Sequence, residues 1–212
     1  MEDAGKFNTF GRRVLAAFFD TGIYSCTFAL ILYSGSLSYG LTTYMQCLLI
    51  NLIAVYCYAI ITTYTIGGTF GKRVFNLVVV DANHLGKVSL LQAILREMLN
   101  IGLSLLAICV LIYSFKNQGH QAIISYITGK NRTLLMRIQD NLSLILGLAE
   151  LGTCLFSNKR RALHDLIART VVTKNKTVKW YFVLLALLIT AIGMILSSRA
   201  YNSFKNAVLQ FQ

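Results

Sequence analysis

Apolar and polar positions divide this chain into long apolar runs separated by short polar segments. Five runs approach or reach the roughly 20 residues that a helix needs to cross a bilayer. They cover residues 14–33, 42–66, 98–115, 134–157 and 180–197. The fourth run is the least apolar, because Arg137, Asp140 and Glu150 fall within it, and if it only lies in the membrane interface the topology after it inverts. The pattern predicts an all-α transmembrane helical bundle of about five spans.

Two polar segments between these runs contain short series of β-branched residues, which favour strands over helices. Residues 74–81 read VFNLVVVD and are followed by a turn-like Asn83–Gly86, and residues 168–175 read ARTVVTKN. We predict a small cytoplasmic β-sheet that pairs residues 75–81 with residues 170–174. The alternative is that each segment is a loop that contains valines.

The C-terminal residues have the spacing of an amphipathic helix. Tyr201, Phe204, Val208 and Phe211 follow one another at intervals of three and four residues, so they share one helical face. We expect a C-terminal amphipathic helix that lies in the membrane interface or docks on a partner.

The composition indicates a membrane protein, and the distribution of basic residues predicts its orientation in the membrane. Only 13% of the 212 residues are charged, against about 25% in soluble domains. The formal net charge is +12, but the basic residues flank the apolar runs and do not gather on one soluble face, so no nucleic acid partner is expected. With five crossings, fourteen Lys and Arg fall on one side and six on the other, which places the N-terminus in the cytoplasm. The positive charge predicts contact with membrane lipids, preferentially anionic ones.

The sequence contains no pattern that predicts catalysis, a metal or another cofactor. The five cysteines fall inside apolar runs and form no C-x-x-C pair, so neither a disulfide framework nor a zinc site is expected. His164 and Asp165 are adjacent, which directs their side chains differently on a helix, and no nucleophile accompanies them. We therefore expect no catalytic residues and no enzyme.

An acidic residue stands inside the first apolar run. Asp20 follows Arg13 by seven positions and Arg12 by eight, so all three lie near one helical face. A carboxylate within a span is costly and marks either an ion or proton site or a structural bond to a neighbouring helix. We predict that Asp20 is shielded from lipid and within hydrogen-bond reach of a polar group on another helix or of a basic side chain. Glu150 is a second candidate acid of this kind.

Two basic segments are candidates for contact with lipid headgroups. Residues 65–73, TIGGTFGKR, resemble a phosphate loop, but the spacing of the glycines and the missing Ser or Thr exclude a nucleotide-binding loop. A glycine-rich helix end with Lys72 and Arg73 as headgroup anchors is the simpler interpretation. Arg160 and Arg161 begin a basic segment that is either an inner-leaflet anchor or part of a ligand site.

Three motifs follow one another along the chain. The first is R-R-x-x-A-x-x-x-D at residues 12–20. The second is G-x-T-x-G-K-R at residues 67–73, followed by V-V-D at 79–81 and by Arg96–Glu97. The third is R-x-L-H-D-x-I-A-x-T at residues 161–170. In this order the motifs resemble those of the RDD family of bacterial membrane proteins, over about residues 8–175.

The resemblance implies a multi-pass protein of the bacterial cytoplasmic (inner) membrane. It implies a membrane domain over residues 1–175, which the chain extends by a further span and tail over residues 176–212. The family is named for one arginine and two aspartates, and between Asp81 and Asp165 we favour Asp165 as the second aspartate. We expect Arg12 or Arg13 to contact it directly.

Two functions follow from these patterns. The first is transport of a small ion or solute, including cation/proton exchange, through a homo-oligomer or with a partner membrane protein. Its candidate ion or ligand residues are Asp20, Arg12, Arg13, Asp165 and Glu150. The second is a membrane scaffold or assembly factor that binds lipid or a partner protein without transport.

Overall fold

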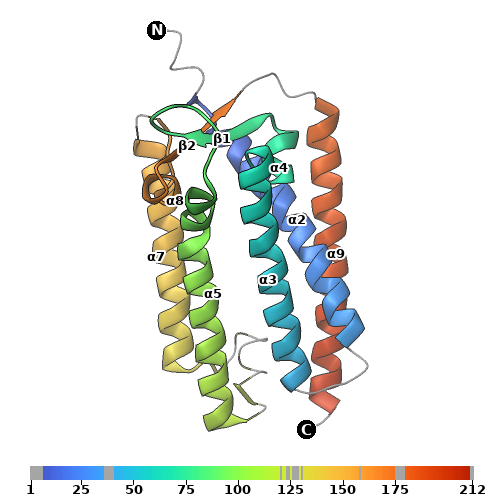
Figure 1. Cartoon of the computed structure of the whole chain (residues 1–212). Helices are drawn as coiled ribbons and strands as arrows, with labels where there is room; N and C mark the ends of the chain where they lie inside the picture. Colours follow the sequence, from blue (N-terminus) through green and yellow to red (C-terminus); the bar gives the residue numbers. More distant parts are fainter. Residues whose placement is uncertain are drawn as a thin grey trace.

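The computed structural model is a bundle of long helices capped at one end by short elements (Figure 1). It describes residues 7–35, 41–119, 121, 122, 125, 129, 131–157, 159–174 and 180–210. The long helices run alternately in opposite directions. They are α2 (Phe10–Gly35), α3 (Leu41–Ile66), α5 (Leu90–Gln118), α7 (Leu134–Phe156) and α9 (Trp180–Gln210). The prediction of a mainly helical bundle is confirmed.

The short elements gather at the end of the bundle where α2 begins, which we call the sheet end (Figure 1). Helix α4 (Phe70–Val74) precedes strand β1 (Leu77–Asp81), and helix α8 (Leu163–Ile167) precedes strand β2 (Thr170–Lys174). The strands are antiparallel, with Leu77 opposite Lys174 and Asp81 opposite Thr170. The predicted pairing of the two valine-rich segments is therefore confirmed.

Apolar side chains join the sheet to the first helix. Leu77, Val79 and Val172 are buried and cluster with Ala16 and Phe19 of α2. Burying these side chains stabilises the cap by the hydrophobic effect, so the sheet holds the α2 end in a fixed position.

Three segments within the described residues are long and apolar enough to cross a membrane. They are Leu48–Val74, Leu90–Gln118 and Val183–Ala200. Helices α2 and α7, which carry Asp20 and Glu150, are not among them. The structure therefore supports three of the five expected spans.

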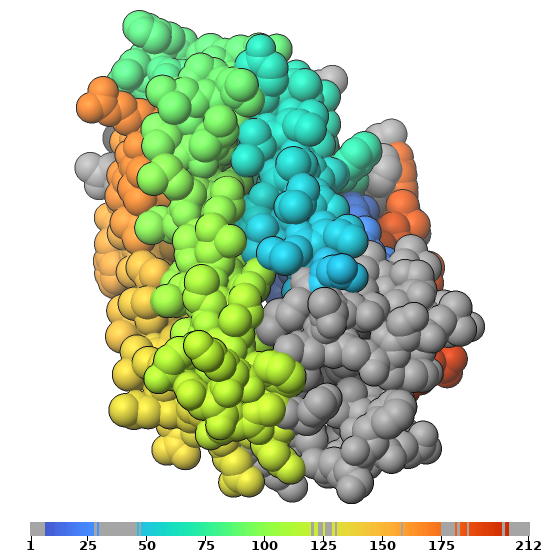
Figure 2. All heavy atoms as spheres, turned by 60° about the horizontal axis from the view of Figure 1, so that its bottom comes forward, coloured from blue at the N-terminus to red at the C-terminus, as the bar shows by residue number. Residues whose placement is uncertain are grey.

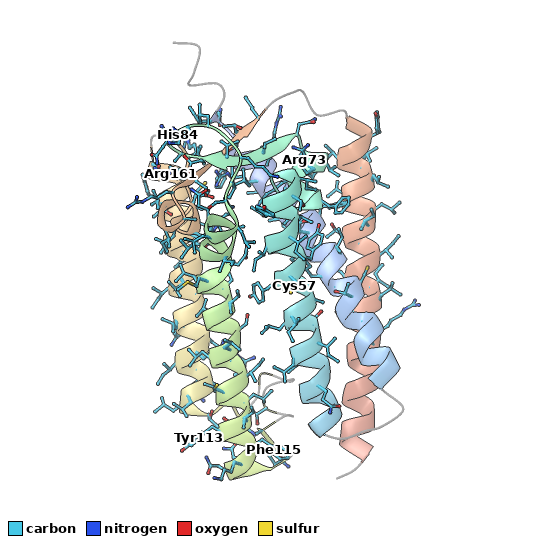
Figure 3. The ribbon with its side chains drawn as sticks, viewed as in Figure 1. Cys57, Arg73, His84, Tyr113, Phe115 and Arg161 are labelled. Atoms are coloured by element: carbon cyan, nitrogen blue, oxygen red, sulfur yellow. The ribbon has the colours of Figure 1, made fainter. Side chains whose placement is uncertain are left out.

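The outer faces of the long helices are apolar. Large aliphatic side chains such as Ile112 of α5, Leu148 of α7 and Leu188 of α9 are more than half exposed. Figure 2 shows α3, α5 and α7 packed along one face of the molecule. Figure 3 places the labelled Arg73 and His84 at the sheet end. A bundle that exposes such side chains along its length suits a lipid environment.

Helix α9 packs closely on α2 through small residues. A Cβ added at Gly193 would lie 2.4 Å from the carbonyl oxygen of Gly22, and one added at Gly22 would lie 2.6 Å from Cα of Thr190. The Thr190 hydroxyl also donates to the backbone oxygen of Phe18 at 2.9 Å. Small residues at this spacing are typical of helix pairs in membranes, where close backbone approach replaces the hydrophobic effect as the driving force.

The predicted amphipathic tail is helical, but it is not a separate helix. Helix α9 continues without a break to Gln210, because residues 198–210 contain neither glycine nor proline to end it. Phe211, the last member of the predicted apolar face, lies outside the described residues.

Candidate functional site

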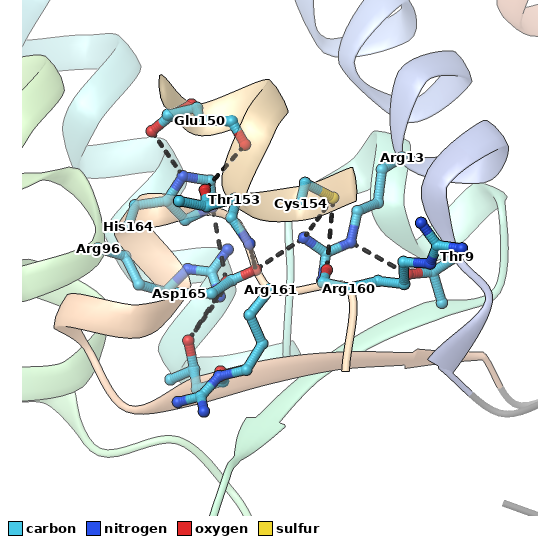
Figure 4. A network of polar contacts seen from close by, with 12 residues as sticks. Thr9, Arg13, Arg96, Glu150, Thr153, Cys154, Arg160, Arg161, His164 and Asp165 are labelled. Atoms are coloured by element: carbon cyan, nitrogen blue, oxygen red, sulfur yellow. Dashed lines mark hydrogen bonds and ion pairs between the residues drawn. The ribbon is translucent and has the colours of Figure 1, made fainter. Parts of the chain in front are cut away.

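The sheet end contains a buried carboxylate that receives hydrogen bonds from several elements. Asp165 of α8 has 0% of its surface exposed. Its Oδ2 accepts from Arg13 of α2 at 2.7 Å and from the backbone N–H of Ala162 at 3.2 Å. Its Oδ1 accepts from Arg96 of α5 at 2.5 Å and from the hydroxyl of Thr170 at 3.3 Å. Figure 4 shows this cluster.

Each of the two arginines that meet Asp165 is also held by a threonine. Nε of Arg13 donates to the hydroxyl of Thr9 at 3.1 Å, and Nη1 of Arg96 donates to that of Thr170 at 3.0 Å. One carboxylate thus joins α2, α5 and α8, and Thr170 connects them to β2. The predicted contact between one arginine of the first motif and Asp165 is confirmed, and that arginine is Arg13.

The surroundings of Asp165 stabilise its charged form. Burial by itself raises the pKa of a carboxyl group, but Arg96, His164 and Arg13 outweigh it and hold the pKa of Asp165 well below its usual range. The side chain therefore remains a carboxylate at neutral pH.

A histidine extends the cluster to α7. Nδ1 of His164 lies 2.8 Å from Glu150, and Nε2 lies 3.6 Å from Oδ1 of Asp165. The two adjacent side chains have different main partners, Glu150 for His164 and the two arginines for Asp165, although the edge of the His164 ring comes near the Asp165 carboxylate. Glu150 is thereby placed next to the ionic cluster.

Asp20 bonds to the glycine-rich segment after α3. Only 6% of its surface is exposed, and its carboxylate accepts from the Thr69 hydroxyl at 2.6 Å and from the Gly71 backbone N–H at 3.0 Å. The prediction of a shielded Asp20 with a polar partner on another element is confirmed. Both oxygens are in use, which favours the structural interpretation over an ion site.

The glycines of this segment permit a close approach of backbones. A Cβ at Gly71 would lie 2.4 Å from the carbonyl oxygen of Ala16. Gly67 has a φ of 77°, a conformation that glycine adopts readily, and its carbonyl oxygen accepts from the N–H of Val79 in β1 at 2.7 Å. The glycine-rich segment therefore connects α3, α4, β1 and α2.

Asp81 organises the turn after β1. Its Oδ1 accepts from the backbone N–H groups of Asn83 and His84 at 2.7 and 3.1 Å, and its Oδ2 accepts from Gln92 of α5 at 2.5 Å. These bonds, with Gln92 the largest contribution, lower the pKa of Asp81. Of the two aspartates weighed as the second family aspartate, Asp165 is the one that meets arginine.

The expected headgroup anchors lie in different surroundings. Lys72 lines an internal cavity, whereas Arg73 is exposed at the sheet end. Arg160 donates to the carbonyl oxygen of Leu155 at 2.6 Å, and Arg161 donates to that of Thr170 at 3.1 Å. Arg160 and Arg161 thus hold the end of α7 and the start of β2. Arg12 is half-buried and takes no part in the contacts of Asp165 described here.

A cavity of about 380 Å³ lies beside the ionic cluster. Its charged and titratable lining residues are Arg13, Asp20, Lys72, Arg96, Glu97, Glu150 and His164. Within the described part of the chain, no three His, Cys, Asp or Glu side chains converge as metal ligands. The cavity therefore offers a mixed ionic lining.

Two further cavities of about 320 Å³ each share residues with the first. Tyr24 lines all three, and Glu97 and Asn100 line the first and one of the others. Tyr56 and Ser104, whose hydroxyls lie 2.8 Å apart, line both further cavities. The first cavity lies at the sheet end, among α2, α5, α7 and the cap, and the two further cavities are lined by α2, α3 and α5.

Sequence reasoning missed Arg96 as a partner of Asp165. Arg96 stands at the end of the second motif, and the motif alone predicts no partner for it. The spacing of Ala93 and Arg96, both buried, places them on one face of α5 with Asn100 one turn further. A small residue followed by polar residues on one face of a helix indicates that this face is polar and turned towards the inside of the bundle.

The fold and the ionic cluster together define the class of protein. An apolar helical bundle, tied at one end by a buried carboxylate between two arginines, is a membrane-type protein. The chain belongs to the RDD family, whose model matches residues 7–169. Helix α9 lies beyond the matched residues. No curated protein and no solved structure matches the chain.

Proposed function

We propose that this protein carries a small ion or solute across the bacterial inner membrane. The observation that supports this most directly is that a cavity at the sheet end and two cavities among α2, α3 and α5 share Tyr24 as a lining residue. Polar side chains such as Asn51, Tyr56 and Ser104 are expensive inside a bundle in lipid, and they typically mark a route for a polar substrate.

Glu97 is the ionisable residue best placed to act on that route. It lines the first cavity and the next, and its only described hydrogen bond comes from Asn100 at the long distance of 3.5 Å. Asp20, in contrast, has two shorter bonds from Thr69 and Gly71. A carboxylate with free lone pairs can exchange a cation for a proton, so Glu97 supports cation/proton exchange.

The proposed orientation places the sheet end in the cytoplasm, with five crossings. Arg73 and Lys87 at this end belong to the larger group of basic residues, and positive charge is typical of the cytoplasmic side. The size of the chain supports function as a homo-oligomer or with a partner membrane protein, in a bilayer that contains anionic lipid.

Ion flux into liposomes tests this proposal. The purified full chain is reconstituted, and proton movement is followed with an internal pH-sensitive dye after a sodium, potassium or lithium gradient is imposed. We expect Glu97→Gln to abolish coupled proton movement, and Asp20→Asn to reduce it only as far as it reduces the amount of folded protein. Asp140→Asn is the matched control, because Asp140 pairs with Arg132 and lines none of the three cavities.

A scaffold or assembly factor is the second candidate function. The full occupation of both Asp20 and Asp165 by internal bonds favours it, because such bonds make a rigid platform. Folded, reconstituted protein that moves none of the three cations and no protons would contradict transport and leave this function.

A further inference from the structure

Two arginines at the ionic cluster, Arg96 and Arg13, have buried hydrogen-bond donors without acceptors. Arg96 has 1% of its surface exposed, and only its Nη1 is engaged, by Asp165 and Thr170. Its Nε and Nη2 have no partner among the described residues, and the same is true of Nη2 of Arg13. Buried guanidinium N–H groups are usually paired, so these atoms require an explanation.

The free atoms of Arg96 form one edge of the guanidinium group. Nε–H and the adjacent Nη2–H point in the same direction, which is the arrangement that receives two oxygens of one carboxylate or phosphate. Arg96 and Arg13 both line the 380 Å³ cavity beside the cluster. The unpaired edge is therefore next to a space that can hold a ligand.

A third cation lines the same cavity. Lys72 forms no hydrogen bond or ion pair within the described residues, and it is close enough to Arg96 for their charges to interact. Asp165 pairs with Arg13 and Arg96, whereas Lys72 has only the longer-range attraction of Asp20, Glu97 and Asp165. The Lys72 ammonium is therefore available to bind an anion in the cavity.

The other acids of the cavity do not pair with Arg96. Both oxygens of Asp20 accept hydrogen bonds, Glu150 is paired with His164, and the one described contact of Glu97 is a long one with Asn100. None of these carboxylates is paired with the free edge of Arg96. The missing acceptor must come from outside the described residues.

We propose that Arg96, Arg13 and Lys72 bind a phosphate group in this cavity. Nε and Nη2 of Arg96 donate to two of its oxygens, and Nη2 of Arg13 and the Lys72 ammonium complete the site. The phosphate belongs either to a free anion or to a lipid headgroup. Leu151 of α7 lines the cavity and is half exposed. A lipid can therefore reach the cavity from the outer surface beside this apolar side chain. This site shares the first cavity with the proposed transport route, but phosphate binding there does not require transport.

Equilibrium binding to the full chain in nanodiscs tests the site with two probes. The first is radiolabelled inorganic phosphate, dialysed against protein in phosphatidylcholine discs. The second is phosphatidylglycerol, mixed into the discs and measured as lipid retained by the protein in native mass spectrometry. Saturable binding of the first identifies a free anion, and selective retention of the second identifies a lipid phosphate; either supports the site.

Lys72→Gln is the principal variant, because Lys72 bonds to no other described residue and its loss leaves Asp165 paired. We expect it to weaken binding about tenfold or more, the effect of losing one charge-assisted hydrogen bond. Arg73→Gln removes the same charge from an exposed neighbour outside the cavity and should leave the binding of inorganic phosphate unchanged. Arg96→Lys keeps the charge beside Asp165 but lacks the paired edge, and it should weaken binding as well.

The proposal is overturned if neither probe binds, if Lys72→Gln binds as the original chain does, or if Arg73→Gln loses as much affinity as Lys72→Gln. No ion gradient enters this experiment. A failure of phosphate binding therefore leaves the flux result untouched, and absent flux with intact binding counts against transport alone.

Discussion

Nη1 of Arg13 lies 2.7 Å from Oδ2 of Asp165, although 152 positions separate the two residues. Nη1 of Arg96 bonds to the other oxygen of the same carboxylate. The start of α2 and the start of α5 are thus held by one side chain of α8. Burying a carboxylate between two guanidinium groups costs free energy, because all three charged groups lose water. Removing one of the partners costs more, because the charges that remain are then buried without a partner.

Neutralising Asp165 should strongly destabilise the protein. We expect Asp165→Asn to lower the free energy of unfolding by about 3–5 kcal/mol, because it leaves two buried guanidinium groups without their carboxylate. Denaturant unfolding in detergent micelles measures the change. Arg73→Gln, at an exposed position, is the control and should change stability by less than about 0.5 kcal/mol.

Charge reversal separates the pair from the cluster. Asp165→Arg should abolish folding. Adding Arg13→Asp restores a pair of opposite charges, so it should recover part of the folded protein. The recovery should be incomplete, because Arg96 still faces an arginine in the double variant. A double variant that recovers no folded protein contradicts a direct pair between Arg13 and Asp165.

Two features of the cap were predictable from the sequence. The β-branched runs identified the paired strands, because consecutive β-branched residues such as Val78–Val80 and Val171–Val172 favour strands over helices. The family motifs and the expected topology together placed Arg13 and Asp165 in one layer. These features depend on local residue type and on order along the chain.

Other features of the site could not be predicted from residue types, because they depend on how distant segments meet in the folded chain. The partners of Asp20 are a hydroxyl and a backbone N–H, and the latter is available only because the chain turns at Gly67 and approaches α2 at Gly71. The sequence alone predicts no partner for Arg96, which stands just before an apolar run. Its burial follows from how α5 and α8 meet.

Gly71 should not tolerate a side chain. A Cβ there would lie 2.4 Å from the Ala16 carbonyl oxygen and 2.8 Å from the Asp20 carboxyl carbon. We expect Gly71→Ala to lower the free energy of unfolding by about 1–3 kcal/mol through overpacking. Gly86→Ala is the matched control, because a Cβ at Gly86 meets nothing within 4 Å. Equal thermal midpoints for the two variants would contradict the close contact.

The helix beyond the family match should be integral to the fold. A Cβ at Gly193 would collide with the carbonyl oxygen of Gly22, so we expect Gly193→Leu to separate α9 from α2. After limited proteolysis between β2 and α9, the C-terminal fragment of the variant should separate from the rest of the protein. In the original chain, the fragment should still co-purify with the rest after the same cut. Gly102→Leu, at a helical position with no atom within 4 Å of an added Cβ, should behave as the original chain does.

The acid stability of the protein should report the charged state of Asp165. The pKa of Asp165 is lowered in the folded protein, chiefly by Arg96 acting against burial, so the unfolded state binds the proton more readily. The carboxylate therefore contributes its full stability above the unfolded pKa of about 3.9. That contribution is lost progressively as the pH falls below this value towards the folded pKa. We expect the difference in unfolding midpoint between the original chain and Asp165→Asn to be constant from neutral pH to about pH 5 and to shrink below about pH 4. A difference that vanishes already near pH 6 would mean that the folded carboxyl group takes up its proton more easily than a free one, and that the two arginines do not hold its charge.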